Sequence, residues 1–292
     1  MKDLEHAIHG ATKLAGIIGW PVEHSLSPAM HNAAFAELGL DWVYVPLPVF
    51  PDHLGDAIRG LLAMGFSGAN VTVPHKQTVM QYLDDISHDA QVIGAVNTIH
   101  IEGGQLYGDN TDAPGFLRSL EDVGFEHFEG RAAVLGAGGS ARAVAHALAQ
   151  AGSKNVFLFS RRRQQAADLC SDLSRFHPRV KFSAHNLTEV DQIDDRIDLL
   201  VNATPVGMWP DTETSPWPQQ LPVPGHLTVC DLVYNPAESR FLAQAKAAGA
   251  QAINGLGMLV SQGALAFKTW TDIRPPIDTM KAACLRAMGR SE

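Results

Sequence analysis

Gly136-Ala137-Gly138-Gly139-Ser140-Ala141 is the stretch that decides the fold of the second half of the chain. Residues 132–135 before it form a short apolar run typical of a buried strand, and residues 142–151 after it carry apolar side chains at helical spacing. Strand, glycine-rich turn and helix are the context that a G-x-G-x-x-[G/A] fingerprint requires. The glycines let backbone N–H groups approach a pyrophosphate at the positive end of the helix. The stretch therefore predicts dinucleotide binding; the alternative is an ordinary glycine-rich turn.

Three arginines follow the next predicted strand. The run 155–159 ends at Ser160, Arg161, Arg162 and Arg163. A site that prefers NAD usually has an acidic residue near this point to hold the ribose 2′-hydroxyl. Arginines instead favour a 2′-phosphate, because guanidinium groups pair with phosphate and stack on rings. The sequence therefore favours NADP; the alternative is a solvated basic start of a helix.

Strands and helices alternate along the whole chain. Before the glycine turn, the pattern predicts strands over 14–19, 42–45, 68–73, 96–101 and 106–110, the last two as a hairpin, and helices over 28–38, 52–64, 76–83 and 112–123. After it, the pattern predicts strands over 132–135, 155–159, 180–183, 197–202, 228–232 and 251–253, a proline-rich loop over 203–224, and helices over 239–248, 258–270 and 277–288. Such alternation predicts an α/β fold of two units with parallel sheets covered on both faces.

Polar residues gather where the strands of the first unit end. They are Ser25, Ser27, Asn70, Thr72, Lys76, Asn97 and Asp112. Open α/β sheets bind ligands beyond the carboxyl ends of their strands, so this set suits a small polyhydroxylated acid. Alternatives are Ser27 and Asp112 as helix N-caps, Lys76 as a solvated lysine, and Asn70, Thr72 and Asn97 as partners of loop backbone.

Composition bounds the function further. The chain has 292 residues, 46% of them apolar and 18% charged, and a formal net charge of −9, which argues against nucleic acid as a partner. Three distant cysteines without Cys/His ligand spacing disfavour a structural zinc site and suit a reducing cytoplasm. The charged, polar start predicts no signal peptide, and no apolar run has the length of a membrane span.

Seven motifs, in order, connect the chain to a known family. They are Gly19-Trp20-Pro21-Val22-Glu23-His24-Ser25-Leu26-Ser27-Pro28 with His31-Asn32, Gly68-Ala69-Asn70-Val71-Thr72-Val73-Pro74-His75-Lys76, Gly94-Ala95-Val96-Asn97-Thr98, Gly108-Asp109-Asn110-Thr111-Asp112, Asn202-Ala203-Thr204-Pro205-Val206-Gly207-Met208, Asp231-Leu232-Val233-Tyr234-Asn235-Pro236, and Gly255-Leu256-Gly257-Met258-Leu259 leading to Gln262. In these motifs the chain resembles the shikimate dehydrogenase family along nearly its whole length.

The resemblance implies an NADP-dependent enzyme that reversibly reduces 3-dehydroshikimate to shikimate in aromatic amino-acid biosynthesis. It implies a discontinuous substrate domain, 1–113 with 255–292, to which the C-terminal helices return, and a Rossmann-type NADP domain, 114–254. We expect a cytoplasmic monomer or homodimer that binds neither nucleic acid nor membrane.

The resemblance also implies roles for single residues. Lys76 and Asp112 would be the catalytic pair. Substrate contacts would come from Ser25, Ser27, Asn70, Thr72, Asn97, Tyr234 and Gln262. Cofactor contacts would come from Gly136, Ala137, Gly138, Gly139 and Ser140 at the pyrophosphate, Ser160, Arg161 and Arg162 at the adenosine 2′-phosphate, and Leu232 and Gly255 at the nicotinamide.

The chain departs from the family pattern at two places. The family's usual Asn-Arg-Thr is Ser160-Arg161-Arg162 here, with Gln165 where a basic residue often follows, and Asn254 stands where Asp often precedes Gly-Leu-Gly. Two alternatives therefore remain: a quinate/shikimate dehydrogenase that uses NAD or NADP, and a non-catalytic family member that senses a ligand.

Overall fold

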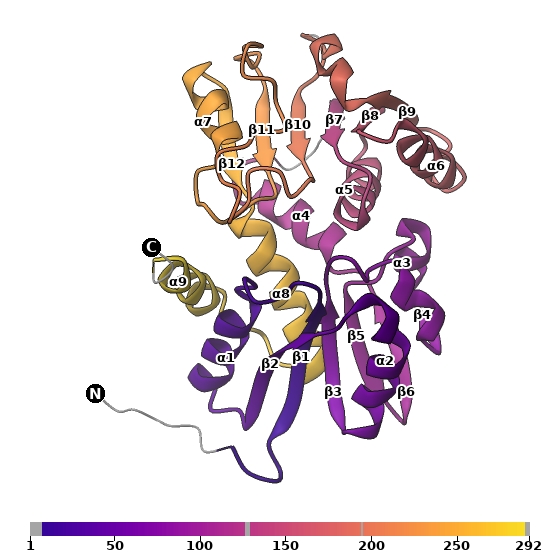
Figure 1. Ribbon diagram of the computed structural model, residues 1–292, viewed down its shortest axis with the longest axis vertical. Coiled ribbons are helices and arrows are strands. Elements are labelled where there is room, and N and C mark those ends of the chain that lie inside the picture. Colours follow the sequence, from indigo (N-terminus) through magenta and orange to yellow (C-terminus); the bar gives the residue numbers. More distant parts are fainter. Residues whose placement is uncertain (1–7, 126–128, 194, 290–292) are drawn as a thin grey trace. The chain divides into compact units, whose positions relative to one another are not determined.

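The computed structural model describes residues 8–125, 129–193 and 195–289, and the chain forms two compact units. Unit 1 comprises Met1–Thr111 and Val260–Glu292, and unit 2 comprises Asp112–Leu259. The helix α8, Leu256–Thr271, therefore begins in unit 2 and ends in unit 1. Each unit contains one six-stranded sheet (Figure 1).

The sheet of unit 1 is mixed. Its strands lie in the order β2-β1-β3-β5-β6-β4, with bounds β1 Lys13–Gly19, β2 Trp42–Pro48, β3 Phe66–Val71, β4 Asp85–Ile86, β5 Thr98–Glu102 and β6 Gln105–Asp109. β1 runs parallel to β2 and β3, whereas β5 is antiparallel to both β3 and β6. The expectation of a parallel sheet is therefore wrong here, although the predicted hairpin is confirmed. Gly103 and Gly104 at its turn have φ of 59° and 81°, which glycine adopts without strain.

The other elements of unit 1 are helical. They are α1 Ser27–Glu37, the 3₁₀ helix η1 Pro51–His53, α2 Leu54–Ala63, the 3₁₀ helix η2 Thr78–Tyr82, α3 His88–Ile93, the second half of α8, and α9 Ile277–Met288. Leu54, Ile58 and Leu61 of α2 pack on Ile18 and Ile99 of the sheet. Neither α3 nor β4 was predicted, because both are too short to carry a periodic pattern.

The segment between β3 and α3 differs from its prediction. A helix was expected over 76–83, but the structure forms only η2 there, and β3 ends at Val71, so Thr72 lies just beyond it. The backbone explains this difference. The Lys76 carbonyl accepts the Val96 N–H at 2.8 Å, so it is engaged by a neighbouring segment and not by a helical turn.

Gly68 of β3 lies beneath the indole of Trp270 of α8. The Trp270 Nε1–H donates to the Ile99 carbonyl of β5 at 2.9 Å, and a Cβ at position 68 would lie 2.3 Å from that same Nε1. The indole therefore crosses β3 at the one point where the strand carries no side chain. This contact ties α8 to the sheet of the first 111 residues.

The sheet of unit 2 is parallel throughout, as predicted. Its order is β12-β11-β10-β7-β8-β9 (Figure 1), with bounds β7 Arg131–Leu135, β8 Asn155–Ser160, β9 Lys181–Asn186, β10 Leu199–Asn202, β11 Thr228–Asp231 and β12 Gln251–Asn254. Numbered from β7, this order is 3-2-1-4-5-6, the order of dinucleotide-binding sheets. The strand order reverses between β7 and β10, and ligands of such sheets bind at that point.

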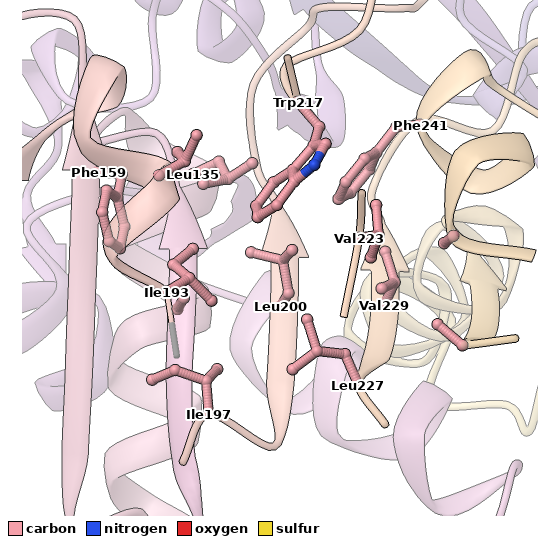
Figure 2. Packing of buried hydrophobic residues seen from close by; sticks show 14 of the residues in the cluster. Leu135, Phe159, Ile193, Ile197, Leu200, Trp217, Val223, Leu227, Val229 and Phe241 are labelled. Carbon is pink, nitrogen blue, oxygen red and sulfur yellow. The ribbon is translucent and has the colours of Figure 1, made fainter. Parts of the chain in front are cut away.

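The remaining elements of unit 2 are α4 Asp112–Glu121, α5 Gly139–Gln150, α6 Arg163–Ser174, the 3₁₀ helix η3 Leu187–Gln192 and α7 Arg240–Ala247. The predicted irregular loop 203–224 is confirmed as free of helices and strands. Its Trp217 is 2% exposed and packs with Leu200 and Phe241, and its Nε1–H donates to the Leu221 carbonyl (Figure 2). This loop therefore supplies core to one face of the sheet.

His31 of α1 is a buried histidine enclosed by aromatic rings. Its ring stacks on Tyr44, with centroids 4.4 Å apart and planes 12° apart, and lies 6.2 Å from the ring of Phe267. Neither ring nitrogen has a hydrogen-bond partner among the described residues. Burial lowers the pKa of His31 to about 3, so the imidazole is neutral in the folded chain.

We predict that His31 makes the fold acid-sensitive. Below pH 6.5, the ordinary pKa of histidine, the unfolded chain binds a proton at His31 that the folded chain does not bind. The free energy of unfolding is therefore unaffected by His31 above pH 6.5 and decreases as the pH falls toward 3. The loss amounts to about 3 kcal/mol at pH 4.5. Urea unfolding at pH 7.5 and pH 4.5 should show this loss in the wild type and a smaller one in His31→Phe. The same substitution at exposed His53 should leave the difference unchanged; equal pH effects in all three proteins would contradict the prediction.

Candidate active site

A buried hydrogen-bond network in unit 1 joins Tyr44 within β2, Asn70 near the end of β3 and Thr98 at the start of β5. The Tyr44 hydroxyl donates to Asn70 Oδ1 at 2.8 Å and is also hydrogen-bonded to the Ser27 hydroxyl. The Asn70 amide Nδ2 donates to the Asn97 carbonyl and to Thr98 Oγ1, both at 3.2 Å. Because both N–H bonds of this amide are engaged within the protein, Asn70 has only acceptor capacity left at Oδ1.

Asn97 extends the network to α8 and to the chain before α4. Its Oδ1 accepts the Thr111 N–H at 2.7 Å, and its Nδ2 donates to Thr111 Oγ1 at 3.0 Å and to Gln262 Oε1 at 3.3 Å. All members of this group are at least nine-tenths buried. These two hydrogen bonds between Asn97 and Thr111 hold Thr111 in position, and Thr111 directly precedes Asp112.

The other predicted residues of unit 1 border this network. Ser25 is half-buried, and its Oγ accepts the Ser27 N–H at 3.3 Å. Thr72 donates its backbone N–H to the Ile18 carbonyl at 2.8 Å, and Lys76 is half-buried. Ser27 was considered as an N-cap, which is wrong: Leu26 occupies that position without a side-chain cap, and the Ser27 hydroxyl bonds Tyr44.

Tyr44, Thr98 and Thr111 are members of this network that were not singled out from the sequence. Tyr44 lies within the apolar strand β2 and Thr98 starts the apolar strand β5, so from the sequence both are expected to pack in the core. Thr111 was quoted only as part of a motif. A signal was present for Thr98 and Thr111, because buried asparagines such as Asn70 and Asn97 need partners.

In unit 2, the glycine turn has the geometry of a phosphate-binding turn. Gly136 has φ of 122°, and a Cβ there would lie 3.0 Å from the Ala203 carbonyl oxygen. Gly138 is exposed at the N-cap of α5, and a Cβ there would meet nothing within 4 Å. No side chain of the described residues caps this helix start. Its backbone N–H groups and open approach fit a phosphate group.

The three arginines divide into two kinds. Ser160 ends β8, and its Oγ accepts the Arg162 N–H at 3.3 Å. Arg161 and Arg162 are exposed just beyond the strand. Arg163, the first residue of α6, donates from Nε to the Ala184 carbonyl of β9 at 3.3 Å. Arg163 is therefore tied to the neighbouring strand, whereas Arg161 and Arg162 follow the strand end where a 2′-phosphate would bind.

Asp231 ends β11 and is fully buried. Its Oδ1 accepts from Asn202 Nδ2 at 2.8 Å and from the Val233 N–H at 3.0 Å, and its Oδ2 accepts from the Ser239 hydroxyl at 2.5 Å. Burial raises the pKa of Asp231 to about 6, although these three donors lower it. The sequence analysis gave Asp231 no role.

Leu232, Tyr234 and Gly255 lie beside this carboxylate. Leu232 and Tyr234 are half-buried in the segment that follows Asp231. Gly255 packs so tightly that a Cβ there would lie 2.2 Å from the Leu232 carbonyl oxygen, and its N–H donates to the Val233 carbonyl at 3.1 Å. Asn254 donates to the Ala237 carbonyl at 3.1 Å, which gives this departure from the family pattern a structural role.

The described residues lack the features of two other kinds of site. They contain no group of three or more His, Cys, Asp or Glu side chains that could hold a metal ion. Nor do they include a helix with the length and apolar character needed to cross a membrane.

Asp112, the predicted partner of Lys76, is the first residue of α4 and is 4% exposed.

Three family models match the chain. Residues 17–99 match the shikimate dehydrogenase substrate binding domain, residues 121–207 match shikimate / quinate 5-dehydrogenase, and residues 255–285 match the shikimate 5′-dehydrogenase C-terminal domain. The matches thus cover segments of both units.

Whole-chain comparisons agree with these matches. A shikimate dehydrogenase (NADP(+)) from Desulforamulus reducens is 45% identical over 279 residues, 94% of this chain and 95% of the relative. A solved structure of a shikimate dehydrogenase in complex with NADP⁺ has a TM-score of 0.89 and 43% identity, covering 96% and 97% of the two chains. The enzyme from Thermus thermophilus in complex with NADP(H) and shikimate has a TM-score of 0.83 and 40% identity, covering 94% and 99%. The chain belongs to the shikimate dehydrogenase family.

Proposed function

We propose that this chain is an NADP-dependent shikimate dehydrogenase that reversibly reduces 3-dehydroshikimate to shikimate, a step of aromatic amino-acid biosynthesis. The observation that carries the proposal is the 45% identity over nearly the full length to a shikimate dehydrogenase (NADP(+)). The buried polar network of unit 1 and the glycine turn of unit 2 supply what a hydroxy acid and a dinucleotide need.

Each unit has its own task in this proposal. Residues 1–113 and 255–292 bind the substrate, and residues 114–254 bind NADP. When bound, NADPH supplies the hydride that reduces the substrate ketone. Residues 136–140 hold the pyrophosphate with backbone N–H groups, Ser160, Arg161 and Arg162 hold the adenosine 2′-phosphate, and Leu232 and Gly255 border the nicotinamide. The exposed, unobstructed Gly138 at the start of α5 supports this assignment.

Lys76 is the proton donor in this proposal. As the ketone carbon is reduced, negative charge develops on its oxygen, which an ammonium can stabilise and then protonate. The Lys76 backbone is held by the Val96 N–H, so the side chain starts from a fixed point. Asp112 orients the ammonium and keeps it charged. The backbone that leads into Asp112 is held by the preceding residue, Thr111, which makes two hydrogen bonds with Asn97.

The substrate contacts follow from the network. Ser25, Ser27 and Thr72 supply hydroxyl groups, and Asn70, Asn97, Gln262 and Tyr234 complete the set. Since both amide hydrogens of Asn70 are engaged by Asn97 and Thr98, Asn70 accepts a hydrogen bond from a substrate hydroxyl. The pre-formed bonds hold the side chains of Ser27, Asn70, Asn97 and Gln262 in place before substrate binds, which lowers the entropy lost on binding.

The setting of the enzyme is part of the proposal. We propose a cytoplasmic monomer or homodimer that acts on small molecules. The three cysteines are free and buried, which suits a reducing compartment. A net charge of −9 disfavours binding to nucleic acid.

A substrate-by-cofactor rate matrix tests the function. Shikimate and quinate are each oxidised with NADP and with NAD, and we expect the highest kcat/KM for shikimate with NADP. One of the matched family models names quinate as well as shikimate, so quinate is the competing substrate to include. Faster quinate oxidation would assign the chain to the other activity. Absence of turnover with all four pairs would indicate a ligand-sensing protein.

Replacing Lys76 by alanine should lower kcat by at least ~100-fold, because general acid catalysis contributes about 10²- to 10⁴-fold. The dissociation constant for NADPH, measured by nucleotide fluorescence, should change little. Gln77→Ala, at the exposed neighbouring position, is the control and should keep normal turnover. Near-normal kcat in Lys76→Ala would exclude Lys76 as the acid.

Replacing Arg161 by alanine should weaken NADPH about tenfold or more, because a hydrogen bond between charged groups contributes about 1.5–3 kcal/mol. Binding of NADH, which lacks the 2′-phosphate, should change far less. Arg163→Ala removes an equal charge whose guanidinium is engaged by β9 and is the matched control. Equal losses for NADPH and NADH, or equal losses in the two variants, would contradict the phosphate role.

A further inference from the structure

The carboxylate of Asp231 is the shared anchor of three chain segments in unit 2. It accepts from the Asn202 side chain at the end of β10, from the Val233 N–H just beyond β11, and from the Ser239 hydroxyl at the start of α7. Ser239 is itself the N-cap of α7, accepting the Leu242 N–H at 3.2 Å. One buried acceptor therefore joins two adjacent strand ends and one helix start.

These bonds close the segment between Asp231 and Ser239 into a loop. Residues 232–238, which we call the 232–238 loop, leave from Asp231 itself and return to Ser239, whose hydroxyl donates to Asp231. Further backbone bonds hold the loop between its ends: Leu232 N–H to the Asn202 carbonyl, Gly255 N–H to the Val233 carbonyl, and Trp209 N–H to the Asn235 carbonyl. The loop carries Leu232 and Tyr234.

The strand order gives this loop its place relative to a dinucleotide. In a 3-2-1-4-5-6 sheet, each half binds one mononucleotide, and the halves meet where the order reverses. β7, β8 and β9 form the half that contains the glycine turn and Arg161, so they take the adenosine half. β10, β11 and β12 form the other half, and the 232–238 loop follows the central strand of that half.

We propose that Asp231 is a positioning residue for the nicotinamide half of NADP, acting by fixing the 232–238 loop while leaving the adenosine half of the site untouched. This inference rests on the proposed function. A carboxylate suits the task because it is purely an acceptor, and three donors converge on it. Without it, those three donors would be left buried and unpaired, and the loop would lose the tie between its two ends.

The experiment compares two nucleotides on the same variants. NADPH spans both halves of the site, whereas adenosine 2′,5′-bisphosphate carries only the adenosine, its 2′-phosphate and one phosphate of the pyrophosphate. In Asp231→Ala, the dissociation constant for NADPH should rise about tenfold or more, while that for the bisphosphate should stay within about twofold, both by isothermal titration calorimetry.

Asp231→Asn should restore NADPH binding to within about threefold of the wild type, because the amide keeps Oδ1 for Asn202 and Val233 and can donate to Ser239. Asp198→Ala is the matched control: its exposed carboxylate also accepts a backbone N–H, that of Arg131, but at the amino ends of the strands. This control should bind both nucleotides as the wild type does.

Equal weakening of both nucleotides in Asp231→Ala, or an unchanged constant for NADPH, would overturn the inference. Should Asp231→Ala fail to fold, Ser239→Ala releases only the far end of the loop, and it should weaken NADPH by about threefold or more with the bisphosphate unchanged. Equal changes there would also overturn the inference. Failure of the wild type to bind NADPH would overturn the proposed function itself, and no variant is needed to see it.

Discussion

A buried polar group must find a hydrogen-bond partner, and this requirement governs the polar networks of both units. A site for a polyhydroxylated acid needs amide and hydroxyl groups in a place sheltered from water, where an unpaired donor or acceptor costs about 1–3 kcal/mol. The chain meets that cost by bonding its buried polar side chains to one another. Asn70, Asn97 and Thr111 are held in this way in unit 1, and Asn202, Asp231 and Ser239 in unit 2.

The two units solve the problem with different central groups. In unit 1 the centre is Asn97, an amide that both donates and accepts, so it can join Thr111 and Gln262 at once. In unit 2 the centre is Asp231, on which only donors converge. An amide suits a site that must contact both kinds of substrate group, whereas a carboxylate suits an anchor whose neighbours are all donors. The chemistry of each centre thus follows from its surroundings.

Much of the fold was predictable because its signals are local. A few neighbouring residues are enough to predict the glycine turn, the hairpin glycines and the strands β7, β8, β10 and β11, which are apolar runs. The mixed sheet of unit 1 was not predicted, because strand direction depends on pairing between segments far apart in the chain. The segment after β3 was expected to be helical, but a backbone bond from Val96 to the Lys76 carbonyl overrides that local preference.

Part of the buried network was recognisable in the sequence for the same reason. Polar residues that interrupt an apolar pattern, such as Asn70 and Asn97, stand out in the sequence. Tyr44 does not, because its ring packs against His31 while only its hydroxyl serves the network. Asp231 was missed because a carboxylate at a strand end is unremarkable until its donors are known. Residues that hold the site need spatial neighbours to be recognised.

The crossing of Trp270 over Gly68 links two positions that are 202 residues apart in numbering. The indole and the Ile99 carbonyl oxygen both occupy the volume that a side chain at position 68 would need. Alanine or serine at 68 would therefore require a smaller ring or none at 270, which loses the bond to the Ile99 carbonyl, and also a shift of that carbonyl, whose oxygen would lie 2.4 Å from the new Cβ. Position 68 is therefore expected to stay glycine wherever position 270 keeps its tryptophan, as a pair that records how α8 docks on the first sheet.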